Sequence, residues 1–283
     1  MSEQADRAQR FLALHEGERP LLLPNPWDRG SATLLASLGF EALATTSSGS
    51  AATLGLLDGS LGREEALANA AAIVEATELP VSADLENGFA DDAAGVAETI
   101  RLALAAGLAG ASIEDYSGRE DEPIYVIEAA AERVAAAAEV AHGGPVRLVL
   151  TARAENHLHG VTDLADTIAR LRAYEEAGAD VLYAPGIARM EDIRRVVDSV
   201  ELPVNVLARP GVPSVQELAE AGVRRISVGG AFAFAALGAA TEAARELIEQ
   251  GTYGYLEQAG VGLKSARAAF ASRGSSPPAP ASR

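Results

Sequence analysis

The sequence predicts an α/β protein folded as a (β/α)8 barrel, the TIM barrel, and three observations support this prediction. Short apolar runs rich in β-forming residues alternate with longer helical patterns from one end of the chain to the other. Eight strand-then-helix repeats fit into 283 residues, and about 250 residues is typical of this barrel. Hydrophobic residues make up 48% of the chain, enough to bury a large core. A doubly wound open sheet is the alternative, but its G-x-G-x-x-G fingerprint is missing after the first strand.

The strands are predicted at the short apolar runs, each followed by polar or turn-forming residues. In order they are Leu21–Pro24, Ala42–Ser47, Val81–Leu85, Gly110–Asp115, Arg147–Arg153, Val181–Ala184, Val204–Leu207 and Arg225–Val228. The helices are predicted between them at Ser31–Leu38, Arg63–Ala76, Gly95–Ala106, Val126–Ala141, Leu164–Ala177, Glu191–Val200 and Val215–Ala221. Several of these helices are followed by a glycine, namely Gly39, Gly107, Gly178 or Gly222, which favours a left-handed C-cap there.

Beyond the eighth strand the chain continues with helical patterns. Phe232–Gln250 predicts a long helix and Tyr253–Phe270 a further one, so residues 1–271 are expected to form a single domain. The Ser/Pro/Ala-rich stretch 272–283 is expected to be disordered. An additional helix with alanine over much of its surface needs a packing partner. We therefore expect it to dock on a neighbouring subunit and to make the protein a homo-oligomer.

Composition excludes several classes of function. A formal net charge of −17 argues against nucleic acid as a partner, because binding to a phosphate backbone begins with basic patches. No stretch reaches the ~20 apolar residues that a membrane crossing needs, and no signal peptide is visible at the N-terminus. The absence of cysteine excludes disulfides and a cysteine nucleophile, and is compatible with a cytoplasmic location.

The candidate functional residues follow the strands, because a barrel of this type collects its active site at the carboxyl ends of the strands. Asp84 and Glu86 follow the third strand, and Glu114 and Asp115 end the fourth. Carboxylates gathered at one mouth would repel one another without a cation, so they predict a Mg²⁺ site. Arg153, at the end of the fifth strand, would face a substrate carboxylate or the negative charge that develops during reaction.

Each of these residues also has a structural reading. Asp84 or Glu114 alone could be a helix cap or a salt-bridged group, but the cluster together with Arg153 favours a site. The polar run Thr45–Gly49 could be a simple loop, although its backbone N–H groups would also suit an anion. His157 and His159 form an H-x-H pair with no third partner, for which solvation in a loop is the simpler account.

Several of these motifs, in this order and spacing, resemble the isocitrate lyase/phosphoenolpyruvate mutase superfamily. They are Pro24-Asn25-Pro26-Trp27-Asp28, Thr45-Thr46-Ser47, Leu54-Gly55-Leu56-Leu57-Asp58, Ser82-Ala83-Asp84-Leu85-Glu86-Asn87-Gly88, Ile113-Glu114-Asp115 and Thr151-Ala152-Arg153. The resemblance covers about Phe11 to Gly251. It implies a Mg²⁺-dependent barrel, with Mn²⁺ as a substitute, that makes or breaks a C–C or P–C bond next to a small 2-oxo or 2-hydroxy carboxylate. It also implies a homotetramer, a dimer of dimers, with the eighth helix exchanged between neighbours.

The resemblance assigns roles to individual residues. Asp84 matches the direct metal ligand, and Glu86 and Glu114 match the acidic partners that hold the metal or its waters. The substrate-binding residues implied are Thr46, Ser47, Ser48, Asp58, Arg153 and Asn205, with Asp58 close to the metal shell. Arg153 corresponds to the arginine that faces the reacting group, and the catalytic residues are expected to be Arg153, Glu114 and Tyr116.

This chain departs from the family at the positions that would fix the reaction. The lyases carry a cysteine in the loop after the fourth strand, whereas this chain has the short acidic segment Tyr116–Pro123 and no cysteine at all. The lysine and asparagine of the phosphonate mutases are absent from that loop as well. Without the cysteine, we expect cleavage of a C–C bond in a 2-oxo acid, of the oxaloacetate-decarboxylase kind, or a lyase that uses Tyr116, Glu155 or water.

Two alternatives stay open. One is P–C chemistry, by a phosphonomutase or a phosphonopyruvate hydrolase. The other belongs to a different class, a barrel that binds a metabolite without turning it over. The acidic cluster argues against the second alternative, because clustered carboxylates are energetically costly to keep in a site without function.

Overall fold

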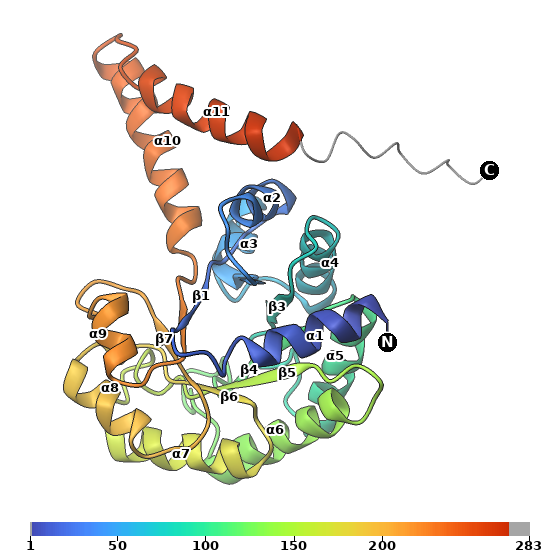
Figure 1. Ribbon diagram of the computed structural model, residues 1–283. Coiled ribbons are helices and arrows are strands. Elements are labelled where there is room, and N and C mark those ends of the chain that lie inside the picture. Colours follow the sequence, from blue (N-terminus) through green and yellow to red (C-terminus); the bar gives the residue numbers. More distant parts are fainter. Residues whose placement is uncertain (1, 272–283) are drawn as a thin grey trace.

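Eight parallel strands form a single sheet in the computed structural model, which describes residues 2–271 (Figure 1). The strands are β1 (Leu21–Leu23), β2 (Leu43–Ala44), β3 (Val81–Asp84), β4 (Gly110–Glu114), β5 (Val149–Arg153), β6 (Val181–Tyr183), β7 (Val204–Leu207) and β8 (Arg225–Ser227). All eight lie where the sequence predicts a strand. The expectation of disorder over 272–283 lies outside the described residues.

The sheet closes almost completely into a barrel. Strand pairing runs from β2 through β3 and on to β8, which pairs with β1, so only the seam between β1 and β2 lacks a ladder. Across this seam the Ala44 N–H donates to the Pro24 carbonyl at 3.1 Å. The Asn25 side chain also spans it, donating to the Thr45 carbonyl at 2.8 Å and accepting from the Gly229 N–H at 2.9 Å. The predicted (β/α)8 barrel is thus confirmed.

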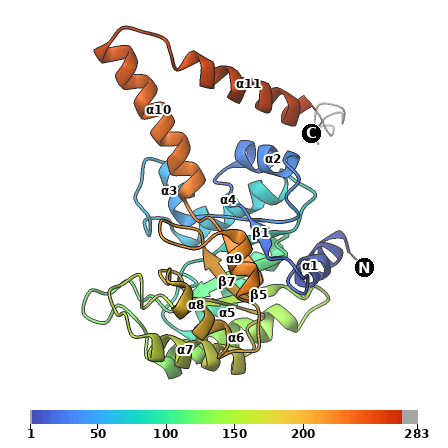
Figure 2. The same ribbon diagram turned by 60° about the vertical axis from the view of Figure 1, so that its left-hand side comes forward.

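The helices alternate with the strands as predicted and pack around the barrel (Figure 2). They are α1 (Glu3–Ala13), α2 (Arg29–Ser37), α3 (Ser47–Thr53), α4 (Arg63–Val74), α5 (Ala93–Ala105), α6 (Ile127–His142), α7 (Leu164–Glu176), α8 (Met190–Val197), α9 (Val215–Glu220), α10 (Ala231–Glu249) and α11 (Leu256–Ala271). Gly107 and Gly178, at φ +84° and +97°, follow α5 and α7 in the left-handed conformation that the sequence predicts there.

Two helices, α1 and α3, have no counterpart in the prediction. The second strand was expected to reach Ser47, but it ends at Ala44 and α3 begins at Ser47. The reason is local: the Thr46 side chain caps the new helix by accepting a hydrogen bond from the Gly49 N–H. The polar run after the second strand is therefore a helix start.

Helix α1 closes the end of the barrel at which the strands begin. Phe11 is fully buried there, and its ring lies against Gly110 at the start of β4. A Cβ atom at Gly110 would come within 2.6 Å of that ring, so only glycine leaves room for it. His15, just beyond α1, is also buried at this end. The barrel is consequently open only at the carboxyl ends of its strands.

The barrel interior is unusually polar for this fold, whose interior is normally filled by branched apolar residues. The inward-facing side chains that line its cavity include Ser82, Ser112, Tyr183, Asn205, Arg225 and Ser227. Arg225 is buried and donates to Asn205 Oδ1 and Thr151 Oγ1, both at 3.0 Å. Apolar packing is instead concentrated between the strands and the surrounding helices. The barrel thus keeps a hydrophilic interior below its open mouth.

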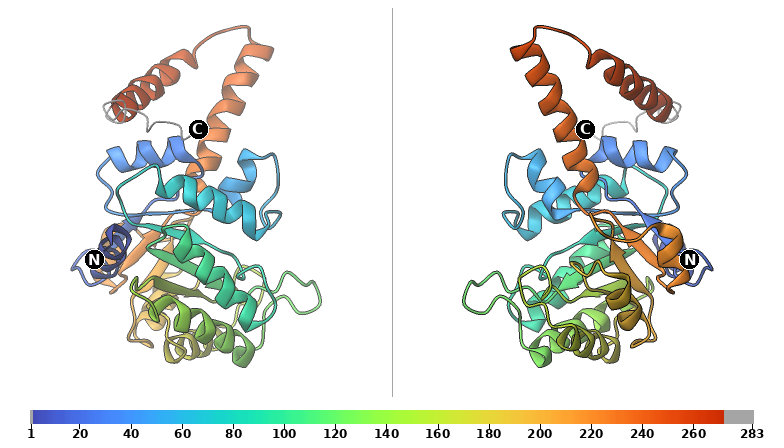
Figure 3. Two further views of the ribbon diagram at one scale, coloured as in Figure 1. Left: turned by 90° about the vertical axis from the view of Figure 1, so that its right-hand side faces the viewer. Right: turned by 90° about the vertical axis from the view of Figure 1, so that its left-hand side faces the viewer.

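The last two helices form an arm that leaves the barrel (Figures 1 and 2). Helix α10 projects outward, and α11 turns back and passes alongside α2 (Figure 3). The arm exposes large apolar side chains, among them Phe234, Ile248 and Val261, of which Ile248 is 83% exposed. The additional C-terminal helix that the sequence predicts is present. None of the helices within residues 2–271 is both long and apolar enough to cross a membrane.

Candidate active site

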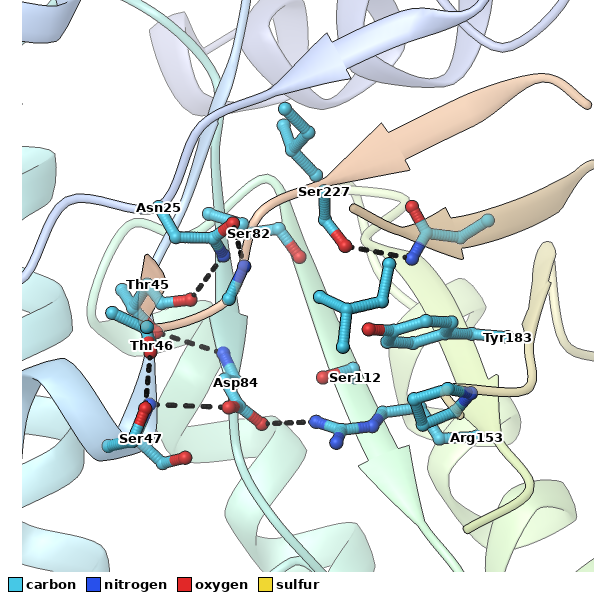
Figure 4. Close-up of a pocket in the computed structure, with 18 of the residues that line it drawn as sticks. Asn25, Thr45, Thr46, Ser47, Ser82, Asp84, Ser112, Arg153, Tyr183 and Ser227 are labelled. Carbon is cyan, nitrogen blue, oxygen red and sulfur yellow. Dashed lines mark hydrogen bonds and ion pairs between the residues drawn. The ribbon is translucent and has the colours of Figure 1, made fainter. Parts of the chain in front are cut away.

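Three neighbouring strands deliver charged side chains to one point of the barrel mouth. Asp84 ends β3, Glu114 ends β4 and Arg153 ends β5, and the strand register pairs Glu114 directly with Arg153. Since parallel strands end at the same rim, these side chains meet there. Figure 4 shows the side chains of Asp84 and Arg153 pointing toward each other across the pocket.

Arg153 is the centre of this cluster. Its Nη1 lies 2.7 Å from Asp84 Oδ1, its Nη2 3.0 Å from Glu114 Oε2 and its Nε 2.8 Å from Glu155 Oε1. Burial by itself would lower the pKa of the guanidinium, but these carboxylates raise that pKa well above its ordinary value. The positive charge of Arg153 is therefore permanent, and its orientation is fixed by three partners.

The start of α3 faces Asp84 from the opposite side. The Ser47 N–H donates to Asp84 Oδ2 at 3.2 Å, and the Asp84 N–H donates to Thr45 Oγ1 at 2.9 Å. The hydroxyls of Thr46 and Ser48 lie 3.1 Å apart in the same segment. Hydroxyl groups from one short segment are thus collected beside the carboxylate that the resemblance assigns to the metal.

Burial and nearby like charges raise the pKa of two glutamates of the mouth, Glu86 and Glu114. Burial first, and then the charges of Asp84 and Asp58, raise the pKa of Glu86 to about 7. The pKa of Glu114 is raised well above its ordinary value because burial, Glu155 and Asp84 outweigh the opposing effect of Arg153. Glu86 also holds a left-handed backbone at φ +47°, which is uncommon for a residue other than glycine and is typical of functional sites.

The donor chemistry of the mouth fits a divalent metal ion. Among residues 2–271, no three or more histidine or acidic side chains are grouped as a ready-made metal cage. Mg²⁺ does not need one, because proteins usually bind it through one or two carboxylates together with waters and substrate oxygens. The hard oxygen donors of Asp84, Glu86 and Glu114 suit this mode, and a cation would offset the like-charge repulsion among them.

Two adjoining cavities open at this mouth. The first, of about 190 Å³, descends into the barrel and is lined by Thr46, Ser47, Ser48, Asp84, Arg153 and Asn205, among others. The second, which we call the outer chamber, has about 460 Å³. Its lining includes Glu86, Glu114, Tyr116, Glu155 and His159. The cavities share Ser47, Asp58, Arg153 and Leu158 in their walls, so these residues stand between a deep compartment and an outer one.

The structure distributes the residues singled out in the sequence over these two compartments. Asp58 lines both cavities and Tyr116 only the outer chamber. Asn205 lies deeper in the barrel, where its side chain donates to Ser227 Oγ at 3.0 Å and accepts from Arg225. Asp115 turns away from both cavities into a buried network. It accepts from the Glu155 N–H at 2.8 Å and also from Tyr174 and Arg170, and so positions Glu155.

Sequence reasoning missed two parts of the site. His159, which the sequence suggested to be simply solvated in a loop, lines the outer chamber and stacks on Tyr116 with ring centroids 3.7 Å apart and planes 7° from parallel. Arg225 forms a positive, buried floor. The alternation of inward and outward residues along the eighth strand could have indicated Arg225, since Ser227 two positions later also lines the cavity.

Fold and mouth together define a barrel protein with an acid-rich, arginine-centred site at the carboxyl ends of its strands. A family model described as phosphoenolpyruvate phosphomutase matches residues 11–248. The oxaloacetate decarboxylase of Ectopseudomonas mendocina is 30% identical over 83% of this chain and 82% of its own length. The 2-methylisocitrate lyase of Escherichia coli is 30% identical over 69% of this chain and 67% of its own.

A similar relation is found among solved structures. A candidate lyase/mutase from Burkholderia cenocepacia J2315 is 53% identical, with a TM-score of 0.88 over 90% of this chain and 92% of that protein. The chain therefore belongs to the phosphoenolpyruvate phosphomutase family, within the isocitrate lyase/PEP mutase superfamily. Members of this superfamily are lyases, decarboxylases and phosphomutases that act on pyruvate-like substrates.

Proposed function

We propose that the protein is a Mg²⁺-dependent enzyme that cleaves a C–C bond in a small 2-oxo or 2-hydroxy carboxylic acid through a pyruvate-like enolate. The observation that carries this proposal is the meeting of Asp84, Arg153 and Ser47 at the barrel mouth, with Glu86 and Glu114 beside them. Members of the superfamily use divalent metals, which agrees with the hard oxygen donors collected here.

The substrate carboxylate would bind beside the hydroxyls of Thr46, Ser47 and Ser48, which line the deep cavity. The reacting end would then face Arg153. Asp84 would hold the metal, with Glu86 and Glu114 holding it or its waters, and the metal would supply Lewis-acid stabilisation of the enolate oxygen. Arg153 adds a positive charge that is already oriented, so no reorganisation is needed as negative charge develops on the substrate.

Proton transfer falls to groups of the outer chamber. Burial raises the pKa of Glu155, so it is better suited to carrying a proton near neutral pH than an exposed glutamate. Tyr116 brings a hydroxyl into the same chamber. We assign Glu114 and Tyr116 to this role, with Glu155 as the third group that can take part.

The second candidate activity is P–C bond chemistry, by a phosphonomutase or a phosphonopyruvate hydrolase. The description of the matching family as a phosphomutase family favours it. Against it, Arg153 is the only cationic side chain within residues 2–271 that lines the outer chamber, and it already pairs with three carboxylates. A transferring phosphonyl group would require more positive charge than this. Binding without turnover is the alternative outside enzymology.

A substrate panel separates these candidates. Oxaloacetate, 2-methylisocitrate, 2,3-dimethylmalate, 4-hydroxy-2-oxopentanoate and phosphonopyruvate are each supplied with Mg²⁺, and release of pyruvate or of a pyruvate-like product is followed. We expect product from a C–C substrate. Product from phosphonopyruvate alone would establish P–C chemistry, and binding of one compound without any product would establish a binding protein.

The metal assignment has its own test. Asp84→Ala should abolish Mg²⁺-dependent turnover while circular dichroism shows the fold retained. Saturating Mg²⁺ should raise the melting temperature of the wild type, because a ligand at 100 times its Kd stabilises by about 2.7 kcal/mol, and this rise should vanish in the variant. Unchanged turnover in Asp84→Ala would place the metal elsewhere.

We also propose that the protein assembles as a homo-oligomer, a dimer of dimers in which the α10–α11 arm packs on a neighbouring subunit. The apolar surface of the arm supports this, because large exposed apolar patches mark association surfaces. A cytoplasmic location stays a prediction and rests on the absence of cysteine.

A further inference from the structure

The outer chamber is where the part of the substrate beyond the enolate must lie. Thr46, Ser48 and Asp84 line the deep cavity alone, whereas the chamber adjoins it across the shared residues Ser47, Asp58, Arg153 and Leu158. Its volume of about 460 Å³ leaves room for a fragment of several non-hydrogen atoms. The chemistry of the chamber walls therefore decides which fragment the enzyme accepts.

The walls are dominated by negative charge. Among residues 2–271, four carboxylates line the chamber, those of Asp58, Glu86, Glu114 and Glu155, against one guanidinium, that of Arg153. Three of the five N–H groups of that guanidinium, on Nε, Nη1 and Nη2, already face Glu155, Asp84 and Glu114. One divalent ion held by Asp84, with Glu86 and Glu114 holding it or its waters, would offset part of this charge without making the chamber positive. Among the described residues that line the chamber, a second substrate carboxylate would find only Arg153 as a cation, and that charge is already shared among three carboxylates.

The remaining wall is flat and uncharged. The Tyr116 and His159 rings lie parallel, with centroids 3.7 Å apart, and Leu158 stands beside them. We call the two stacked rings the Tyr116–His159 plate. Tyr116 is held by a β-bridge to Ile124, and the Ser117 N–H donates to the Pro123 carbonyl at 2.8 Å, so backbone contacts fix the segment that carries Tyr116. Burial lowers the pKa of His159, which keeps the imidazole neutral near pH 7. This plate offers contact to an apolar or hydroxylated group and no charge for an anion.

We propose that the distal fragment of the substrate is uncharged and packs on the Tyr116–His159 plate, so that the enzyme acts on monocarboxylic 2-oxo or 2-hydroxy acids. This inference rests on the proposed function and narrows it.

A 4-hydroxy-2-oxo acid with a neutral tail has the required chemistry. Loss of the C4 hydroxyl proton to a basic group of the chamber breaks the C3–C4 bond. The electron pair of that bond passes into the enolate of pyruvate, and C4 becomes the carbonyl carbon of an aldehyde. The proton then returns to C3, so the products are pyruvate and the aldehyde, and no other reactant is needed.

A matched pair of probes tests the charge preference by binding alone. 2-Oxopentanoate and 2-oxoglutarate have the same chain length and differ in the distal carboxylate. With Mg²⁺ present, calorimetry should show 2-oxopentanoate binding about tenfold or more tightly, and added salt should narrow the difference because it screens the repulsion. Equal or tighter binding of 2-oxoglutarate overturns the inference.

Substitutions on the plate test the same point within the protein. His159→Arg should shift the preference toward 2-oxoglutarate by about tenfold, whereas the uncharged control His159→Gln should keep the wild-type preference. Leu158→Arg adds a charge to the same wall from a side chain that is 44% exposed, and so covers the case in which His159→Arg fails to fold. An unchanged preference in a folded arginine variant counts against the proposal.

Turnover separates this inference from the function on which it rests. We expect pyruvate from 4-hydroxy-2-oxopentanoate and little from oxaloacetate. Efficient pyruvate release from oxaloacetate or 2-methylisocitrate would support the proposed C–C cleavage and would refute the proposal that the distal fragment is uncharged. Preferential binding of 2-oxopentanoate without turnover of any C–C substrate would keep the chamber's preference and overturn the cleavage activity.

Discussion

His15 and Arg225 make an unusual contact beneath the barrel cavity. The His15 Nδ1 atom lies 2.8 Å from the Phe11 carbonyl oxygen, to which it donates, so Nε2 is left as the acceptor facing Arg225 Nη1 at 3.5 Å. Burial, followed by the charge of Arg225, lowers the pKa of His15 to about 4. A neutral imidazole is therefore one of the contacts of the buried Arg225 guanidinium, which pairs with no carboxylate of the part of the chain that the structure describes.

This contact predicts a loss of stability in acid. The folded-state pKa of His15 is depressed below its unfolded value, so between about pH 6.5 and pH 4 the unfolded chain binds a proton that the folded one refuses. The stability contributed by neutral His15 is present above pH 6.5 and is lost as pH falls, by on the order of 3 kcal/mol. Chemical denaturation from pH 4 to 7 measures it.

The control is His15→Gln, whose amide can accept from Arg225 but does not titrate. Other groups also titrate in this range, so the difference between the two proteins is the quantity to compare. The free energy of unfolding of the wild type should fall more steeply toward pH 4 than that of the variant. If the free energy of unfolding fell with pH equally in both proteins, it would contradict the depressed pKa of His15 in the folded state.

The residues of the mouth were predictable to the extent that they end strands. Asp84, Glu114 and Arg153 could be placed together because the carboxyl ends of parallel strands share one rim. The partners of Arg153 and the Tyr116–His159 stack could not be foreseen, because they depend on how loops after different strands fold toward each other. Asn205, which the resemblance assigns to the substrate, lines the deep cavity beside Ser227, at a depth set by the strand register.

Helix α6 holds the loop that carries Glu86. Arg133, from the middle of α6, donates to the backbone carbonyls of Asn87, Ala90 and Asp91 in the segment between β3 and α5. Its guanidinium also lies 4.3 Å from the centroid of the Tyr125 ring. One side chain thus ties three carbonyls of the β3–α5 loop to a neighbouring helix.

We expect Arg133→Met to destabilise the protein by about 1–3 kcal/mol, because it leaves these partly buried carbonyls without the Arg133 donor. In urea the transition midpoint should fall accordingly. Since the loop carries Glu86, the concentration of Mg²⁺ required for half-maximal activity should rise as well. Arg133→Lys keeps the charge but reaches fewer carbonyls, so its urea midpoint should lie between those of the wild type and Arg133→Met. A Met variant as stable as the wild type would show that the loop needs no such support.

The alternation of strands and helices was predictable because each element repeats a local pattern of apolar residues. The two unforeseen helices lack such a pattern for different reasons. Helix α1 lies in a mostly polar segment and gains its stability from burying Phe11 against Gly110, a long-range contact. Helix α3 contains mostly small residues, and its start is fixed by the Thr46 cap rather than by periodicity.

The α10–α11 arm exposes apolar side chains that a single chain leaves uncovered. Phe234, Leu247 and Ile248 on α10 and Val261 on α11 are exposed on a segment that projects away from the barrel. A homo-oligomer would cover them. Light scattering after size exclusion should therefore give a mass above that of one chain, which is 29.1 kDa.

Ile248→Asp should shift that mass toward a single chain, because the side chain is 83% exposed and its replacement leaves the fold of the barrel intact. Arg245→Ala, on the same helix and also solvent-exposed, is the matched control and should not change the mass. A monomeric wild type would refute the assembly.

The closed floor made by α1 imposes an order on catalysis. With Phe11 and Gly110 filling the barrel end opposite the mouth, every molecule enters and leaves through a single opening. The fragment in the outer chamber stands between the deep cavity and solvent, so it must depart first, and the pyruvate-like product can follow only afterwards. Steady-state kinetics should accordingly show the pyruvate-like product as a competitive inhibitor against substrate and the other product as a noncompetitive one.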